Sequence, residues 1–177
     1  KLFSQIVWRD VDLNDVLSLD ELLNEITAVY HCAALVSLNN SDRNELLKVN
    51  VEGTANLVNA CIDKKIESFC FVSSIATIQN QDIKTDLDEN VLWKSKPNEN
   101  VYSLSKYLAE QEVWRGMEEG LNVVIVNPGV IVGPGNWDRG TGKLFSLSKK
   151  GVLFYTEGVN GFVDVKDVAG VCIRLMN

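Results

Sequence analysis

Short apolar runs alternate with longer amphipathic stretches along the whole chain. The apolar runs are rich in β-branched and aromatic residues and are almost unbroken, which is typical of strands buried on both faces of a parallel sheet. These runs are IVWRDV (6–11), AVYHCAAL (28–35), SFCFVSS (68–74) and NVVIVNPG (122–129). Because each run is followed by a helical pattern, the order predicts an α/β fold with right-handed crossovers.

The stretches between these runs predict three helices. Ser18 is placed to cap LDELLNEI, and Asn40 or Ser41 to start a long helix through DRNELLKVNVEGTANLVNACIDKK. The third helix is predicted from Tyr102 to about Gly120, because glycine favours the left-handed conformation that ends many helices. Residues 79–100 are polar and irregular, and we expect them to form a loop over the strand ends.

Composition narrows the class of protein. Hydrophobic residues make up 46% of the chain and charged residues 23%, as in soluble globular proteins. The net charge of −7 disfavours a nucleic-acid or anionic-membrane surface, and no apolar run reaches membrane-spanning length. Cys32, Cys61, Cys70 and Cys172 stand singly in apolar segments, which favours buried, reduced thiols in a cytoplasmic protein. His31 is the only histidine, so we expect no metal centre and no serine–histidine–aspartate triad.

The candidate chemistry begins with YSLSK, in which Tyr102 and Lys106 are four residues apart and share one helix face. Carbonyl reduction needs an acid beside the oxygen, and a free tyrosine has a pKa of about 10. An ammonium nearby favours tyrosinate and should lower the pKa of the phenol. We therefore interpret Tyr102 as a general acid/base and Lys106 as its electrostatic partner. A solvated Tyr–Lys pair is the structural alternative.

Ser73 and Ser74 end the strand that precedes the long loop, at the edge of a parallel sheet where ligands bind. The Ser74 hydroxyl is placed to orient a substrate oxygen beside Tyr102. A strand-end turn that satisfies its own backbone is the alternative interpretation of both serines.

Seven segments, in order, resemble the extended short-chain dehydrogenase/reductase family, also called the NAD-dependent epimerase/dehydratase family. They are DVDLND (10–15), VYHCAALVS (29–37), VNVEGTANLVNAC (49–61), FVSSIAT (71–77), YSLSK (102–106), NPGVIVGPG (127–135) and FVDVKDVA (162–169). The resemblance implies a Rossmann-like doubly wound parallel sheet that binds NAD or NADP, and choosing Ser74 over Ser73 rests on it. No glycine occurs before Gly53. We therefore expect residues 1–177 to form a partial NAD(P)-binding domain, without the first βαβ segment and most of a substrate lobe that starts near 136–160.

The resemblance also implies roles for residues around Tyr102. Lys106 would bind the hydroxyls of the nicotinamide ribose, as well as acting on Tyr102. Asn50 would help to hold a water that passes protons to Lys106, and a structural hydrogen bond to the backbone is the alternative. We interpret Gly53 as close packing of helix on sheet.

Further cofactor contacts are implied at three strand ends. Asp12 would accept the adenine amino group while Leu13 covers the ring, although Asp12 is also suited to a turn or a cap. Small side chains after the second strand would admit the ribose, and the NPG turn would place a valine against the nicotinamide. These last residues are Cys32, Ala33, Ala34, Pro128 and Val130.

Three functions are consistent with this set. The sequences of the segments HCAALVS and NPGVIVGPG favour an NAD(P)-dependent carbonyl reductase or alcohol dehydrogenase similar to dihydroflavonol reductases. A nucleoside-diphosphate-sugar epimerase or dehydratase is the alternative, although Ile78 and Gln79 stand where such enzymes usually have a tyrosine-glycine pair. A non-catalytic dinucleotide-sensing regulator is the third, disfavoured by the retention of Tyr102 and Lys106. Homodimerisation through the Tyr102 helix and the 41–63 helix is an expectation from relatives.

Overall fold

A three-stranded parallel sheet in the order β1-β2-β3 lies at the centre of the fold. The computed structural model describes residues 5–37, 39–78, 88–91, 93, 100–138, 140–151 and 160–177. The strands are β1 (Ala28–His31), β2 (Ser68–Val72) and β3 (Val123–Val126). Val29 pairs with Phe69, which pairs in turn with Val123. The predicted parallel α/β sheet is therefore confirmed.

The prediction that IVWRDV forms the first strand is wrong. Residues 6–11 have no regular secondary structure, and Ile6, Val7 and Trp8 are 48%, 75% and 73% exposed. Within the described ranges no strand pairs with this run, and a β-strand needs a neighbour for its backbone hydrogen bonds. An apolar run alone does not supply that neighbour.

Helix α1 (Val16–Leu22) begins after Asp15, not at Ser18. The Asp15 carboxylate accepts hydrogen bonds from Ser18 N at 3.3 Å and from Ser18 Oγ at 2.6 Å. Ser18 thus lies in the first turn and donates to the cap, because the aspartate three residues earlier is the residue with a free acceptor at the helix start.

The long helix predicted after β1 exists, and it has four parts. They are the 3₁₀ turn η2 (Asn40–Asp42), α2 (Arg43–Leu46), the π-helical segment η3 (Leu47–Glu52) and α3 (Gly53–Asp63). Asn39 is the N-cap, and its side chain accepts a hydrogen bond from Ser41 N at 3.3 Å. The π-helical segment contains Asn50.

Helix α4 (Val101–Glu118) carries Tyr102 and Lys106. Asn100 caps its start, since its side-chain oxygen accepts a hydrogen bond from Tyr102 N at 2.8 Å. Gly120 follows the C-cap with φ +101°, a conformation that L side chains rarely adopt. Gly120 N donates to Met117 O at 3.0 Å and Leu121 N to Gly116 O at 2.9 Å, so the predicted glycine C-cap is confirmed.

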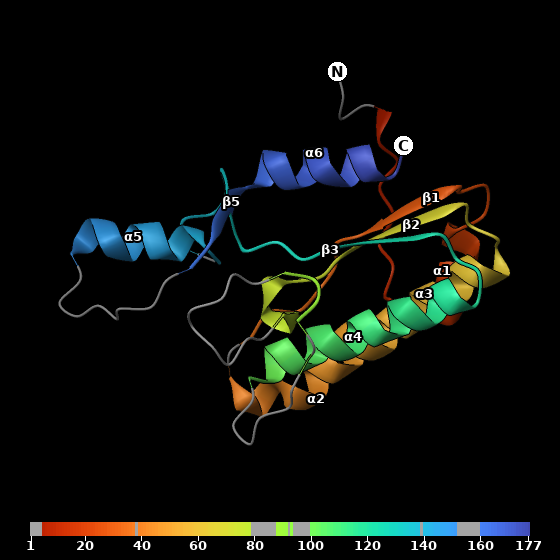
Figure 1. Cartoon of the computed structure of the whole chain (residues 1–177), viewed down its shortest axis with the longest axis horizontal. Helices are drawn as coiled ribbons and strands as arrows, with labels where there is room; N and C mark the ends of the chain where they lie inside the picture. Colours follow the sequence, from red (N-terminus) through yellow and green to blue (C-terminus); the bar gives the residue numbers. More distant parts are fainter. Residues whose placement is uncertain are drawn as a thin grey trace.

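A second, two-stranded parallel sheet was not predicted. It consists of β4 (Val130–Val132) and β5 (Phe162–Asp164), with Ile131 opposite Val163. Helix α5 (Gly142–Lys150) lies before β5 in the chain, and α6 (Val165–Leu175) follows it. The short turn η4 (Ile75–Thr77) follows β2. Figure 1 shows α5 and β5 beside the carboxyl ends of the central strands.

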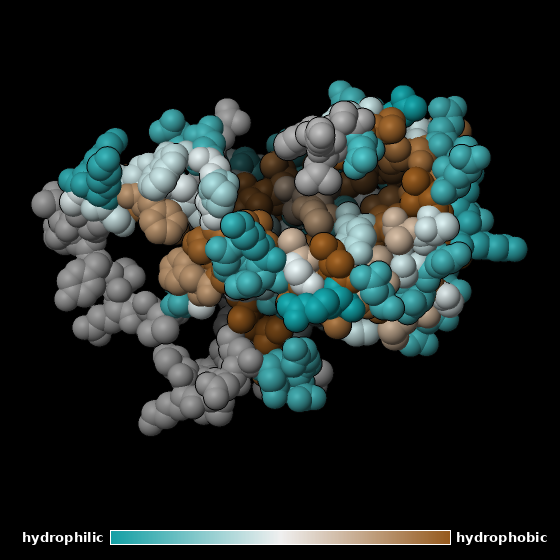
Figure 2. Space-filling view, turned by 90° about the horizontal axis from the view of Figure 1, so that it is seen from above, coloured by the Kyte–Doolittle hydropathy of each residue, from teal (hydrophilic) through white to brown (hydrophobic). Residues whose placement is uncertain are grey.

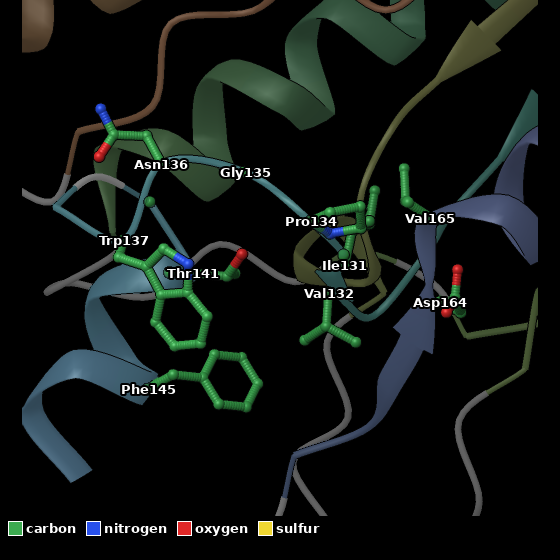
Figure 3. Close-up of a pocket in the computed structure, with 13 residues that line it drawn as sticks. Ile131, Val132, Pro134, Gly135, Asn136, Trp137, Thr141, Phe145, Asp164 and Val165 are labelled. Atoms are coloured by element: carbon green, nitrogen blue, oxygen red, sulfur yellow. The ribbon is translucent and has the colours of Figure 1, made fainter. Parts of the chain in front are cut away.

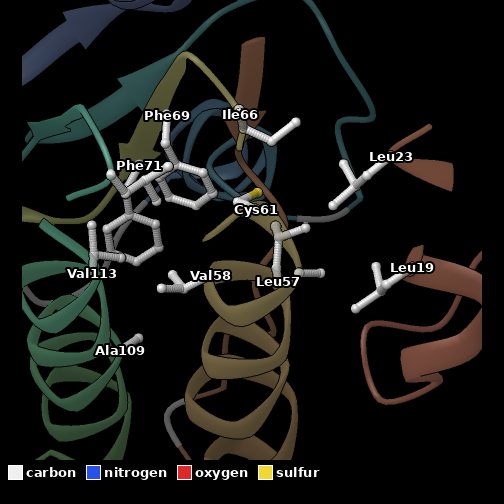
Figure 4. Close-up of a cluster of buried hydrophobic side chains, with 12 residues drawn as sticks. Leu19, Leu23, Leu57, Val58, Cys61, Ile66, Phe69, Phe71, Ala109 and Val113 are labelled. Carbon is white, nitrogen blue, oxygen red and sulfur yellow. The ribbon is translucent and has the colours of Figure 1, made fainter. Parts of the chain in front are cut away.

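Helices α3 and α4 cover one face of the central sheet, and α6 lies over the other (Figure 1). The larger core fills the space between the central sheet and helices α3 and α4, where Phe69 and Phe71 are fully buried (Figure 4). A smaller core joins Cys70 of β2 to Val168 and Cys172 of α6. From above, apolar side chains gather toward the centre of the molecule and hydrophilic ones toward its rim (Figure 2).

None of the helices in the described residues combines the length and the apolarity that crossing a bilayer requires. The predicted loop 79–100 lies mostly outside the described residues, as do residues 152–159 of the predicted substrate lobe.

Candidate active site

The fold brings Tyr102 and Ser74 together. Tyr102 lies in the first turn of α4, and Ser74 follows β2 and caps η4. The side chain of Ser74 is a hydrogen-bonding partner of the Tyr102 phenol, and its Oγ also accepts a hydrogen bond from Ala76 N at 3.2 Å. Ser73 instead donates its hydroxyl to Glu110 Oε2 at 2.6 Å. Ser74 rather than Ser73 therefore faces the phenol, and it also forms the strand-end turn.

The expectation that Lys106 lowers the pKa of Tyr102 is wrong for this structure. Burial raises the pKa of the phenol above its usual value, and the hydrogen bond with Ser74 lowers it by less. Lys106 is not among the groups that shift the pKa of this phenol. Tyr102 is consequently held in its protonated form, the form that donates a proton.

Lys106 is buried, with 2% of its surface exposed. Its Nζ donates to Val72 O at 2.9 Å and lies 4.2 Å from the centroid of the Phe71 ring. Burial lowers the pKa of Lys106 to about 8, against an opposing effect of Glu110. An ammonium has three N–H donors, and Val72 O is the acceptor found for it in the described part of the chain. The remaining donors suit the ribose hydroxyls of a nicotinamide dinucleotide.

Asn50 forms the structural hydrogen bonds that the sequence left as an alternative. Its Oδ1 accepts from Leu35 N at 2.7 Å, and its Nδ2 donates to Leu35 O and to Ser105 Oγ, both at 2.9 Å. Ser105 Oγ donates in turn to Tyr102 O at 2.8 Å. Asn50 thereby ties the segment after β1 to the first turn of the helix that carries Tyr102.

His31 is buried in β1 beside this network. Its Nε2 lies 2.9 Å from Thr54 Oγ1, and the Thr54 hydroxyl donates to Asn50 O at 2.6 Å. Because the single hydroxyl proton is used there, His31 Nε2 is the donor to Thr54. Burial first, and then the charge of Lys106, lower the pKa of His31 to about 4. The imidazole is therefore neutral near pH 7.

The candidate cofactor residues after β1 form an exposed run, Cys32, Ala33 and Ala34. Their small side chains leave the backbone approachable at the carboxyl end of the strand, which fits a dinucleotide ribose. The expectation that all four cysteines are buried is wrong for Cys32, which lies beyond the last ladder pair of β1. Cys70 and Cys172 are buried neighbours, and burial raises the pKa of Cys70 to about 12.

Asp12 and Leu13 lie before α1. Asp12 is exposed, and its Oδ1 accepts from Asn14 N at 2.9 Å and from Asn14 Nδ2 at 3.2 Å, which lowers its pKa. It thus forms a turn through one oxygen, and Oδ2 is not used in these bonds. Leu13 packs against Gly53: a Cβ at Gly53 would lie 3.0 Å from Leu13 Cβ. Gly53 therefore permits close packing, as predicted, but against this segment and not against the sheet.

Pro128 and Val130 lie between β3 and β5. Pro128 O accepts a hydrogen bond from Ile75 N at 2.9 Å, which joins the NPG turn to η4. Val130 begins β4, and its N donates to Gly161 O at 2.8 Å. Pro128 is therefore bonded to the segment that follows Ser74, and Val130 is bonded to the segment that precedes β5.

A cavity of 670 Å³ lies between β4, β5 and α5 (Figure 3). Trp137 and Phe145 line it with their rings edge to face, 6.1 Å between centroids. Val132 and Asp164 line it from the two strands.

Sequence reasoning missed Glu110, Thr77 and Asn127. Glu110 Oε2 accepts hydrogen bonds from Ser73 Oγ at 2.6 Å and from Asn127 Nδ2 at 3.0 Å, with Thr77 Oγ1 at 3.1 Å. Two signals were available: Glu110 follows Lys106 by one helical turn, and Asn127 directly follows the third strand of the sheet.

The parallel α/β sheet, with Tyr102 and Lys106 on one helix and Ser74 at a strand end, agrees with the family that the sequence resembles. A model of the family described as male sterility protein matches residues 15–165. The chain belongs to the extended short-chain dehydrogenase/reductase family, and within it the chain is similar to dihydroflavonol reductases.

Individual proteins agree with this assignment. The chain is 35% identical over 170 residues to a putative dihydroflavonol 4-reductase of Synechocystis, covering 93% of this chain and 48% of that protein. It is 31% identical to cinnamoyl-CoA reductase 1 of Petunia hybrida, covering 89% and 50%. The chain thus spans about half the length of the curated relatives it matches. The Thermus thermophilus UDP-glucose 4-epimerase complex with NAD superposes with a TM-score of 0.77 at 25% identity, covering 94% of this chain and 58% of that chain.

Proposed function

We propose that the protein is an NAD(P)-dependent oxidoreductase that reduces a carbonyl group, or oxidises the corresponding alcohol, in the manner of dihydroflavonol reductases. The observation that carries the proposal is the Tyr102 phenol held protonated against the Ser74 side chain, with the Lys106 ammonium one helical turn away. When bound, the nicotinamide dinucleotide supplies or accepts the hydride.

The chain's own residues account for the proton and for orientation. Ser74 donates a hydrogen bond to the substrate oxygen and holds it beside the phenol. Tyr102 transfers its proton to that oxygen as negative charge develops there. Lys106 turns its free N–H donors to the ribose hydroxyls, while Cys32, Ala33 and Ala34 let the ribose approach. Asp12 keeps one carboxylate oxygen for the adenine amino group, and Leu13, Pro128 and Val130 line the path between.

The test compares the protein, in its full natural length, with Tyr102→Phe and Tyr107→Phe. Tyr107 follows on the same helix and stacks on Trp93 with 4.4 Å between ring centroids, so its phenylalanine variant is a matched control. With NADH or NADPH and a panel of aromatic and aliphatic carbonyls, Tyr102→Phe should lower kcat by about 10²- to 10⁴-fold. Tyr107→Phe should keep the parent's kcat. Equal activity of Tyr102→Phe and the parent would refute the assignment of Tyr102.

A second candidate is a nucleoside-diphosphate-sugar epimerase or dehydratase, because the structural neighbours include UDP-glucose 4-epimerases from Thermus thermophilus and Thermotoga maritima. The latter, at 18% identity, supports the fold alone. Cofactor balance separates the two candidates. Carbonyl-dependent net consumption of NADH or NADPH supports the reductase, and turnover of a nucleotide sugar without net cofactor change supports the epimerase.

Cytoplasmic location and a homodimer formed through α4 and the helix 41–63 complete the proposal. The cysteines, which stand singly in apolar segments of the sequence, support the first, and the exposure of Trp114 and Met117 on α4 supports the second. Sedimentation of the purified protein tests the dimer: a monomer at every concentration would exclude it.

A further inference from the structure

Glu110 connects three segments at the carboxyl edge of the central sheet. One of its oxygens, Oε2, accepts from Ser73 after β2 and from Asn127 after β3, and lies 3.1 Å from the Thr77 hydroxyl of η4. Its other oxygen, Oε1, accepts from Trp114 Nε1 at 3.4 Å. Hydrogen bonds to a carboxylate are shorter and stronger than those between neutral groups. A single charged side chain of α4 therefore fixes the strand end that carries Ser74.

We propose that Glu110 is a positioning residue of the Tyr102 site, holding the segment 73–77 so that the Ser74 hydroxyl meets the phenol. This inference rests on the proposed function.

The contacts around Ser74 support this role. The preceding residue, Ser73, is bound directly to Glu110. The Ser74 carbonyl lies 2.9 Å from the Thr77 hydroxyl and 3.4 Å from Asn127 Nδ2, and both of these groups also lie against Glu110. Thr77 has one hydroxyl proton, so it serves either the carbonyl or the carboxylate at a given time. Ser74 is thus held from both sides of its peptide, which leaves its own hydroxyl to Tyr102 and to the turn.

The charge of Glu110 has a second, separable effect. Several groups face Lys106 from the packed elements: Glu110 on α4, His31 and Cys32 at the end of β1, and the Val72 carbonyl of β2. Glu110 raises the pKa of Lys106 against the larger lowering by burial, and Cys32 raises it less. A neutral side chain at position 110 should therefore lower the pKa of Lys106 below about 8. A merely structural side chain would not produce that change.

The experiment uses Glu110→Gln and Glu110→Asp, with Glu118→Gln as a matched control because Glu118 is an exposed carboxylate on the same helix. Glu110→Gln should lower kcat by about 10- to 100-fold with a smaller change in KM, as expected when a catalytic group is displaced by about 1 Å. NMR titration of ¹³C-labelled lysine, with Lys106 assigned from Lys106→Met, should show a lower pKa for Lys106 in Glu110→Gln. Glu110→Asp keeps the negative charge on a side chain that is one methylene shorter. We therefore expect kcat to fall, and the pKa of Lys106 to change less than in Glu110→Gln. Glu118→Gln should match the parent in both.

An unchanged kcat and an unchanged Lys106 titration in folded Glu110→Gln would overturn the inference. If that variant does not fold, Ser73→Ala and Thr77→Val each remove one contact to Glu110, and a parent-like kcat in both would overturn it equally. Tyr102→Phe measured alongside separates the two proposals: if it is inactive while the Glu110 variants are normal, only the positioning role fails. If Tyr102→Phe is fully active, the proposed function fails, and the lysine titration still tests the effect of Glu110.

Discussion

The buried cation of Lys106 should destabilise the fold near neutral pH, and replacing it should reverse that effect. Burial lowers the pKa of Lys106 from 10.5 to about 8. At about 1.4 kcal/mol for each pH unit, keeping the ammonium charged in the folded state below pH 8 therefore lowers the free energy of unfolding by about 3 kcal/mol. Lys106→Met removes this cost but leaves Val72 O without its donor, which costs about 1 to 3 kcal/mol. The net change in unfolding free energy at pH 7 is small, and its pH dependence is the informative quantity.

The sign follows from proton binding. Between pH 8 and 10.5 the unfolded chain binds the Lys106 proton and the folded protein does not, so the parent gains stability as pH rises. Relative to Lys106→Met, the parent should gain about 1.4 kcal/mol for each pH unit in that window. Urea unfolding of both proteins from pH 7 to 10 measures this difference. Cys61 and Cys70, whose raised pKa values oppose the trend at high pH, are present in both proteins and cancel. A difference in unfolding free energy that stays constant with pH would refute the reasoning.

Three further predictions follow from the same geometry. Because the pKa of His31 falls from 6.5 to about 4 on folding, the parent should lose up to about 3 kcal/mol of unfolding free energy between pH 6.5 and 4, and His31→Gln should lack this loss in acid unfolding curves. Asn50→Ala should lower the free energy of unfolding, measured with urea, by about 2 kcal/mol or more, because the backbone N–H and C=O of Leu35 lose their partners. Asn44 is exposed, so Asn44→Ala should leave that free energy unchanged. Gly120→Ala should lower the free energy of unfolding, measured by thermal denaturation, by about 1 kcal/mol, because a φ of +101° strains the backbone of any L residue with a side chain.

The parallel sheet was predictable because each of its strands is an almost unbroken apolar run followed by a helical pattern. The same rule failed for residues 6–11, since a strand also requires a pairing partner that local sequence does not specify. It gave no sign of β4 and β5, whose three-residue strands are too short for a pattern and pair across the whole of α5.

In the candidate site too, some features could be predicted from the sequence and others could not. The spacing of Tyr102 and Lys106 and the strand-end position of Ser74 were readable from the sequence, because helical and strand periodicity determine them. The direction of the Tyr102 pKa shift was not, because it depends on how deeply the phenol is buried and on its hydrogen bond with Ser74. Glu110 was missed because its partners come from β2, η4 and β3, which are neighbours only in the folded chain.

Spectroscopic titration of the Tyr102 phenol tests the proton-donor claim most directly, taking the difference in tyrosinate absorbance between the parent and Tyr102→Phe. The account predicts a pKa above the usual tyrosine value of about 10, rising further in Ser74→Ala because that variant removes the hydrogen bond that lowers it. A Tyr102 pKa below that value, or one that Ser74→Ala leaves unchanged, would contradict the pairing of phenol and hydroxyl on which the proposed chemistry depends.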